Sequence, residues 1–142
     1  MNWLYILFIT IGAVTLMVIC GYLFLIMPRL HKADAAPIKG LLFAHRGFHS
    51  EKSGPLQNTL AGFAKAVEYG YGMELDVHIT KDKQLAVIHD HHLGALCSHD
   101  GIVEEMTLAE LKKLRVLGSS QKIPTLQEVL DCVAGRTPLL SE

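Results

Sequence analysis

Two acidic side chains lie two positions apart in an otherwise apolar stretch, GMELDVHIT, at residues 72–80. Successive side chains of a β-strand point to opposite faces, so Glu74, Asp76 and His78 are expected to share one face. Carboxylates at this spacing lie about 6.6 Å apart along a strand, which is close enough for both to bind one cation. An amphipathic strand with a solvated polar face fits the same pattern, so this stretch alone leaves both interpretations open.

Polar side chains also end two other apolar stretches. The sequence AHRG contains His45 and Arg46, and the sequence IHD contains His89 and Asp90. Ligand sites in parallel α/β folds form at the carboxyl ends of strands, so we expect these groups to gather beside the acidic pair. A single histidine at a strand end is often structural, but compatible groups at three strand ends indicate a site.

These residue types suit the cleavage of a phosphodiester. A divalent cation held by carboxylates neutralises phosphate oxygens and lowers the pKa of a bound hydroxyl group. Arginine offers a pair of N–H groups to the remaining phosphate oxygens. Two imidazoles can deprotonate the nucleophile and protonate the leaving alkoxide, since histidine titrates near neutral pH. Oxygen ligands favour Mg²⁺ or Ca²⁺ over zinc, and Asp90 either orients His89 or begins the next loop.

Strand and helix signals alternate from residue 41 onward, which predicts a parallel α/β architecture. Apolar stretches predict strands at 41–45, 73–79, 85–89 and 138–142. Helical spacing with capping residues predicts helices at 58–70, 107–114 and 124–135. Asn58 or Thr59 is expected to cap the first helix, and Thr107 with Glu110 forms a capping box for the second.

About four strands in roughly a hundred residues amount to the first half of a TIM (β/α)8-barrel, which typically needs about 250 residues. A half-barrel leaves two strand edges unpaired and its core open. We therefore expect the chain to be a fragment, to come from a truncated reading frame, or to be completed by another polypeptide or by self-association.

An apolar segment at residues 3–27 carries no charged side chain. As a helix it would span about 37 Å, which is enough to cross a bilayer with some tilt. A secretory signal peptide is the alternative, but its apolar region is usually shorter and follows a basic segment, which is missing here. The segment is therefore interpreted as a single transmembrane helix.

The predicted organisation is a transmembrane helix at 1–27, a linker at 28–40 and a partial barrel domain at 41–142. Positive charges follow the helix at Arg29, Lys32 and Lys39, and no charged side chain precedes it. The positive-inside rule then places the catalytic part in the cytoplasm, with a single-pass membrane anchor.

The bulk composition excludes some classes of function. The chain has 142 residues and a formal net charge of −1, which gives no electrostatic case for nucleic-acid binding. Its three cysteines, Cys20, Cys97 and Cys132, are widely spaced and suggest neither a disulfide framework nor a zinc site.

In several motifs the sequence resembles the glycerophosphodiester phosphodiesterases. The matching stretches, in order, are HRG, PLQNT, AGFAKAVEYG, ELDVHITKD, VIHDHHL, TLAELKKL, IPTLQEVL and PLLSE, which together cover essentially all of 41–142. The resemblance implies a TIM barrel. It also implies metal-dependent hydrolysis of glycerophosphodiesters to glycerol 3-phosphate and an alcohol, with a lysophospholipase D-type activity on lysophospholipids as an alternative on the same scaffold.

The resemblance also implies roles for individual residues. His45 and His89 correspond to the acid–base pair, and Arg46 corresponds to a phosphate ligand. The metal ligands of the family correspond to Glu74, Asp76 and Glu142, which are expected to bind Mg²⁺ or Ca²⁺.

One position departs from the family pattern. The family usually has glutamate where this chain has Gln57, which removes a negative charge near the site. A non-catalytic, membrane-bound binding or regulatory module is therefore the alternative to a working enzyme.

Further histidines lie close to these motifs. His91 and His92 invite a transition-metal interpretation, but adjacent histidines in a loop rarely converge on one ion, so both are expected at the surface. His78 either contacts the site or serves a structural role, and the structural role is favoured.

Overall fold

The computed structural model describes residues 2–27, 38–50 and 52–142. The chain divides into two units, Met1–Pro37 and Ile38–Glu142, which are described separately. Residues 28–37 of the predicted linker lie outside the described residues. The same holds for Arg29 and Lys32, two of the three positive charges from which the membrane orientation was predicted.

The first unit contains one helix, α1, at Trp3–Ile26. At 1.5 Å per residue its 24 residues span about 36 Å. Within the described residues, it is the one helix that is long and apolar enough to cross a membrane, and none of its side chains is buried. The same test is passed by a signal sequence near an N-terminus.

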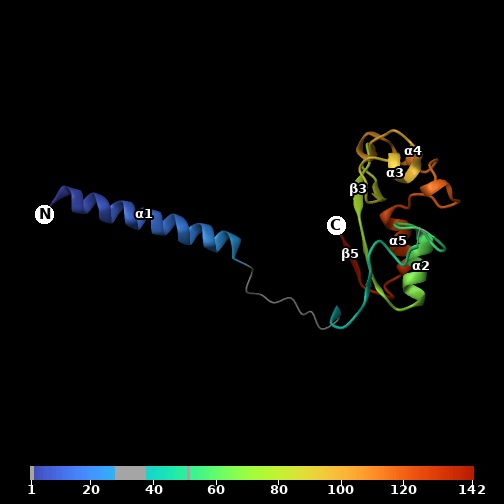
Figure 1. Ribbon diagram of the computed structural model, residues 1–142, viewed down its shortest axis with the longest axis horizontal. Helices are drawn as coiled ribbons and strands as arrows, with labels where there is room; N and C mark the ends of the chain where they lie inside the picture. The colour runs from blue at the N-terminus through green and yellow to red at the C-terminus, as the bar shows by residue number, and fades with distance from the viewer. Residues whose placement is uncertain (1, 28–37, 51) are drawn as a thin grey trace. The chain divides into compact units, whose positions relative to one another are not determined.

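The second unit is built on a parallel sheet of three strands, with the order β1-β2-β5. These strands are β1 at Phe43–Ala44, β2 at Gly72–Leu75 and β5 at Leu139–Ser141. Two helices, α2 at Leu60–Glu68 and α5 at Leu126–Val133, lie side by side against one face of the sheet (Figure 1). Side chains from both helices and from β2, including Phe63, Met73 and Val129, form the core between the layers.

Capping side chains fix where the helices begin, as the sequence predicted. Thr59 caps α2, because its hydroxyl accepts a hydrogen bond from the Gly62 backbone N–H. Thr107 and Glu110 form the predicted capping box at the start of α4, Leu108–Leu111. A second capping box, which the sequence analysis did not predict, lies between Thr125 and Glu128 and begins α5.

The predicted strand at 73–79 is wrong as a single element, because the chain changes pairing partners at Asp76. On the side that faces β5 the pairing continues, since the Glu142 N–H donates to the Leu75 carbonyl and the Val77 N–H donates to the Glu142 carbonyl. On the other side, where β1 pairs with Gly72 and Met73, the Asp76 carbonyl accepts a hydrogen bond from the Ile88 N–H instead. Beyond Asp76, strand β3 at Val77–Ile79 leaves the parallel sheet.

The predicted strand at 85–89 is also not a strand of the parallel sheet. Strand β4, Leu85–Val87, pairs antiparallel with β3 in a two-stranded hairpin in which His78 lies opposite Ala86. Among the described residues the parallel sheet therefore has three strands, where the sequence analysis expected four. Local apolar periodicity identifies a strand but carries no information about the direction of its partner.

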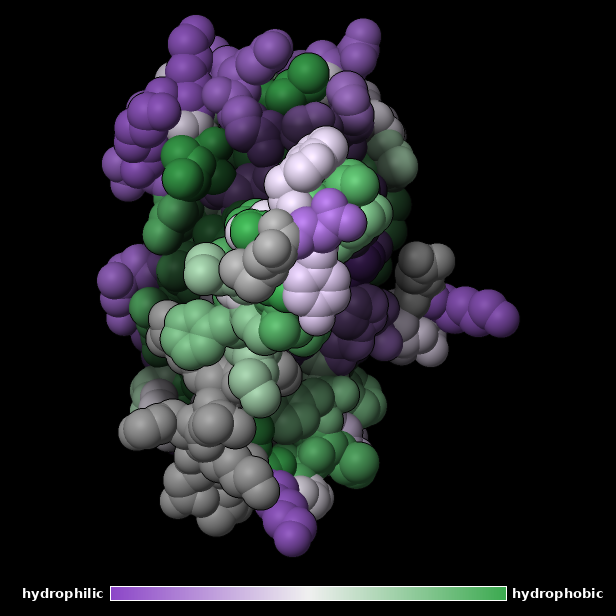
Figure 2. All heavy atoms as spheres, turned by 90° about the vertical axis from the view of Figure 1, so that its left-hand side faces the viewer, coloured by the Kyte–Doolittle hydropathy of each residue, from purple (hydrophilic) through white to green (hydrophobic). Residues whose placement is uncertain are grey.

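Short helical turns follow the hairpin and pack around a second core. They are α3 at Gly94–Cys97, η2 at Val103–Glu105, α4, and η3 at Val116–Gly118. Buried side chains at Leu93, Val103 and Leu111 belong to this core. Outside it, hydrophilic side chains gather over this part of the molecule, at the top of Figure 2.

Candidate active site

Three acidic side chains converge where the parallel strands end. Glu74 lies in β2, Asp76 follows β2 directly, and Glu142 follows β5. The register pairs Glu74 with Leu140, so the carboxyl ends of β2 and β5 are adjacent. One carboxylate oxygen from each acid lies within 4.8 Å of the other two. The structure therefore brings together the three predicted metal ligands.

Arg46 lies against these acids and connects them to the loop after β1. Its backbone N–H donates to Glu74 Oε2 at 3.0 Å, and its Nε lies 3.4 Å from Asp76 Oδ2. Its Nη1 donates to Gln57 Oε1 at 2.9 Å. The backbone of Arg46 has φ 58°, in the left-handed region that is unusual for a side-chain-bearing residue. Its guanidinium is thus held beside the carboxylates.

Asn58 contributes a contact that the sequence analysis did not assign. It was one of two candidate helix caps, but Thr59 takes that role and the Asn58 Nδ2 instead donates to Asp76 Oδ2 at 2.9 Å. The Asn58 N–H donates to the Arg46 carbonyl at 2.9 Å, and Asn58 also has a positive φ of 50°. The sequence signalled this role only indirectly, because Asn58 lies in the PLQNT motif and was the other of the two candidate caps.

The two predicted acid–base histidines occupy different settings. His45 Nε2 lies 3.8 Å from Glu74 Oε2, and the His45 side chain is 72% exposed. His89 Nδ1 lies 2.6 Å from Asp90 Oδ1, so the contact supports an orienting role for Asp90. His89 follows β4 of the hairpin, and its neighbour Ile88 is bonded through the backbone to Asp76. His45 therefore contacts the acids directly, whereas His89 is linked to them through the main chain.

Residues 45–140 of this chain match the glycerophosphoryl diester phosphodiesterase family. The chain belongs to this family.

Similar members of the family come from bacteria and animals. A glycerophosphodiester phosphodiesterase from Caldanaerobacter subterraneus is 40% identical over 111 residues, which cover 73% of this chain and 44% of that protein. A lysophospholipase D from Homo sapiens is 34% identical over 115 residues, which cover 72% of this chain and 36% of that protein.

Solved structures of phosphodiesterases share the fold. The Oleispira antarctica phosphodiesterase, solved in complex with the product sn-glycerol-3-phosphate, matches with a TM-score of 0.65 and 29% identity over 75% of this chain and 45% of that chain. The Thermotoga maritima glycerophosphodiester phosphodiesterase matches with a TM-score of 0.61 and 36% identity over 71% of this chain and 42% of that chain. This chain therefore spans less than half the length of these relatives.

The acid cluster of this family member fits a hard divalent cation. Three carboxylates face one guanidinium, that of Arg46, so the group has an excess of negative charge. The Asn58 Oδ1 is buried without a hydrogen-bond partner among the described residues, and amide oxygens are ligands that hard cations accept. The donor set contains only oxygen atoms, which matches the preference of Mg²⁺ and Ca²⁺.

His78 does not join Glu74 and Asp76, although the sequence pattern placed it in phase with them. Its Nδ1 lies 2.6 Å from Glu104 Oε1 instead, and His91 Nδ1 lies 3.1 Å from Glu104 Oε2. Partial burial raises the pKa of Glu104, but the close approach of His78 and His91 brings it below its usual value overall. Glu104 was missed from the sequence because nothing in its local pattern sets it apart from a solvated acid.

Proposed function

We propose that this chain supplies the metal-binding and phosphate-binding part of a glycerophosphodiester phosphodiesterase, which hydrolyses glycerophosphodiesters to glycerol 3-phosphate and an alcohol. The observation that carries the proposal is the approach of Glu74, Asp76 and Glu142 to within 4.8 Å of one another. Arg46 lies 3.4 Å from the nearest of these carboxylates. Membership of the family supports the same reaction.

The acidic residues and Arg46 would have different roles in this reaction. Glu74, Asp76 and Glu142 would hold Mg²⁺ or Ca²⁺, which supplies positive charge to the phosphate oxygens when bound. Arg46 would use its guanidinium N–H groups to bind the remaining phosphate oxygens.

The two histidines would move the protons. For hydrolysis to glycerol 3-phosphate, one imidazole takes a proton from the attacking water as its oxygen bonds to phosphorus, and the other gives a proton to the leaving alkoxide oxygen as the P–O bond to the alcohol breaks. Asp90 accepts a hydrogen bond at His89 Nδ1 and so leaves His89 Nε2 free for proton transfer. His45 Nε2 lies 3.8 Å from Glu74 Oε2, which places its ring beside the acid cluster.

We propose that this activity takes place at a membrane. Helix α1 would anchor the protein as a single-pass membrane protein, and Lys39 is the first positively charged residue after it in the described part of the sequence. That charge bias supports a cytoplasmic barrel domain. Such an anchor would keep the site near lipid-derived substrates. These include lysophospholipids, the substrate class in the name of the similar human lysophospholipase D.

The proposal is tested on two proteins. One is the 142-residue chain, and the other is a barrel-complete protein, in which the remaining segment of the Caldanaerobacter relative is joined after Glu142. We expect the barrel-complete protein to release glycerol 3-phosphate from glycerophosphocholine, and the 142-residue chain to be inactive because it spans less than half the length of its relatives. Coupled detection of glycerol 3-phosphate measures both, with lysophosphatidylcholine as the second substrate. A folded barrel-complete protein without turnover of either substrate contradicts the proposal.

The substitution Gln57→Glu separates a working site from a decayed one. The Gln57 amide oxygen already accepts a hydrogen bond from Arg46 Nη1 at 2.9 Å, so the side chain has a partner in the present site. We therefore expect Gln57→Glu in the barrel-complete protein to change kcat/KM by less than about tenfold, or about 1.4 kcal/mol. A much larger gain would instead favour the alternative of a degenerate binding or regulatory module.

A further inference from the structure

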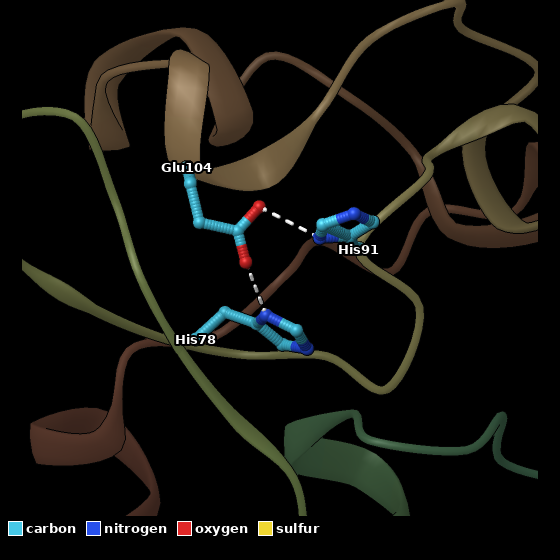
Figure 3. A group of neighbouring side chains, drawn as sticks. All are labelled: His78, His91 and Glu104. Carbon is cyan, nitrogen blue, oxygen red and sulfur yellow. Dashed lines mark hydrogen bonds and ion pairs between the residues drawn. The ribbon is translucent and has the colours of Figure 1, made fainter.

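A second group of metal-binding side chains lies outside the carboxylate cluster. His78 on β3, His91 in the loop after β4 and Glu104 in η2 point toward one another, with the Glu104 carboxylate between the two imidazoles (Figure 3). One ligand atom of each lies within 4.8 Å of the others. The three residues are far apart in the sequence and meet only because of the fold.

The hydrogen bonds of His78 require a positive centre in this group. The His78 Nε2 lies 3.0 Å from the backbone carbonyl oxygen of His89, and a carbonyl only accepts, so Nε2 carries a proton. A neutral ring then presents the lone pair of Nδ1 to Glu104 Oε1 at 2.6 Å. An ionised carboxylate also offers only lone pairs, so this contact is repulsive unless a proton or a metal ion lies between the two atoms.

We propose that His78, His91 and Glu104 form a second metal site, specific for a Zn²⁺-class ion and distinct from the carboxylate site. Two imidazole nitrogens and one carboxylate oxygen are a donor set that zinc prefers over Mg²⁺ or Ca²⁺. Three protein ligands would leave one tetrahedral position for water. The His91 side chain is half exposed, so water can reach this group of residues.

The site also has the outer hydrogen bond typical of zinc histidines. A metal-bound histidine usually donates its other ring N–H to a carbonyl or carboxylate, which fixes the tautomer and the ring orientation. In His78 the His89 carbonyl has this role. An ion here would join β3, η2 and the loop that carries His89, and so hold the backbone of that loop in place.

Zinc binding is measured on the full 142-residue chain in detergent micelles, with excess Mg²⁺ present to occupy the carboxylate site. Competition with a chromophoric chelator gives the Zn²⁺ affinity, and Co²⁺ gives a visible spectrum that reports coordination geometry. We expect one tightly held Zn²⁺ per chain and a Co²⁺ spectrum of low coordination number. If the Zn²⁺ affinity is no higher than that of a simple histidine peptide, the proposal is overturned, and the contact between His78 and Glu104 is then explained by a shared proton.

Single substitutions assign the ligands. His78→Gln, His91→Asn and Glu104→Gln should each weaken Zn²⁺ binding by at least about 100-fold, since loss of even an outer hydrogen-bond partner costs about 10–100-fold. The matched control is His92→Asn, which removes the exposed neighbouring imidazole and should leave the affinity unchanged. The double variant Glu74→Gln with Asp76→Asn should also retain Zn²⁺. Equal losses in His91→Asn and His92→Asn would overturn the assignment.

A further variant separates metal binding from a simple ion pair and covers the case in which Glu104→Gln does not fold. Glu104→His removes the anion but retains a metal ligand, so the three histidines should still bind Zn²⁺ and Zn²⁺ should raise the thermal midpoint of this variant. Loss of Zn²⁺ binding in a folded Glu104→His protein overturns the proposal. Neither measurement depends on phosphodiesterase activity, so failure here is distinguishable from failure of the proposed function.

Discussion

Replacing Glu74 with glutamine or Asp76 with asparagine should reduce kcat/KM of the barrel-complete protein by about 10³-fold or more. A cation at a phosphoryl centre stabilises the transition-state charge by several kcal/mol, and each 1.4 kcal/mol corresponds to about tenfold in rate. Both substitutions remove one negative charge from a cluster of three carboxylates and change the size of the side chain very little.

The hydrogen bonds around these acids make the two substitutions informative. Glu74 accepts from the Arg46 N–H, and Asp76 accepts from the Asn58 Nδ2, and an amide oxygen at either position can still accept the same bond. The local structure should therefore persist while the charge that attracts the cation is lost. A loss of activity would then report on cation binding rather than on unfolding.

Two measurements complete this experiment. Mn²⁺ binding, followed by electron paramagnetic resonance on the 142-residue chain, should weaken in Glu74→Gln and Asp76→Asn. It should not change in the matched control Glu68→Gln, whose carboxylate pairs with Lys65 on the exposed surface of α2. Chelation should abolish turnover of the barrel-complete protein, and added Mg²⁺ or Ca²⁺ should restore it. Full activity after chelation would show that the carboxylates have another role.

Much of the local structure was predictable because it depends on short-range chemistry. Thr59 and Thr107 cap their helices by accepting hydrogen bonds from backbone N–H groups three residues ahead, and such bonds leave a signal in the sequence itself. The alternation of buried and polar residues likewise identified β2, in which Met73 and Leu75 are fully buried and Glu74 is not.

The pairing of strands was not predictable in the same way. Ile79 lies in the predicted strand at 73–79 in phase with the buried Leu75, but it is 53% exposed and belongs to β3, which pairs with β4 in a hairpin. That change of partner depends on the backbone hydrogen bond from Ile88 to the Asp76 carbonyl, and Ile88 is far from Asp76 in the chain. Local periodicity describes one segment and cannot specify such partners.

The same limit separates the predicted site residues from the missed ones. Glu74 and Asp76 stand out because acids are unusual in an apolar stretch, and His45, Arg46 and Asp90 stand out because they follow apolar stretches directly. Glu104 lies in a polar segment, where an acid is ordinary, and only the fold brings it to the histidines.

Replacing His45 or His89 with alanine should each reduce kcat of the barrel-complete protein by about 10²–10⁴-fold, the usual contribution of a positioned general acid or base. The expectation follows from their surroundings. His45 Nε2 lies 3.8 Å from Glu74 Oε2, and His89 Nδ1 lies 2.6 Å from Asp90 Oδ1. The control is His99→Ala, which removes an imidazole that has no assigned role and should leave kcat within about twofold of the unsubstituted protein.

The pH dependence of the rate tests the pairing of the two histidines more strictly than the loss of rate does. The unsubstituted protein should show a bell-shaped profile of kcat/KM, because one imidazole must be neutral to accept a proton while the other must be protonated to donate one. Loss of the base removes the fall in rate at low pH, and loss of the acid removes the fall at high pH. His45→Ala and His89→Ala should therefore remove opposite limbs of the profile, measured on the residual activity. If both variants lose the same limb, or neither loses one, the two residues do not act as an acid–base pair, whatever the size of the rate loss.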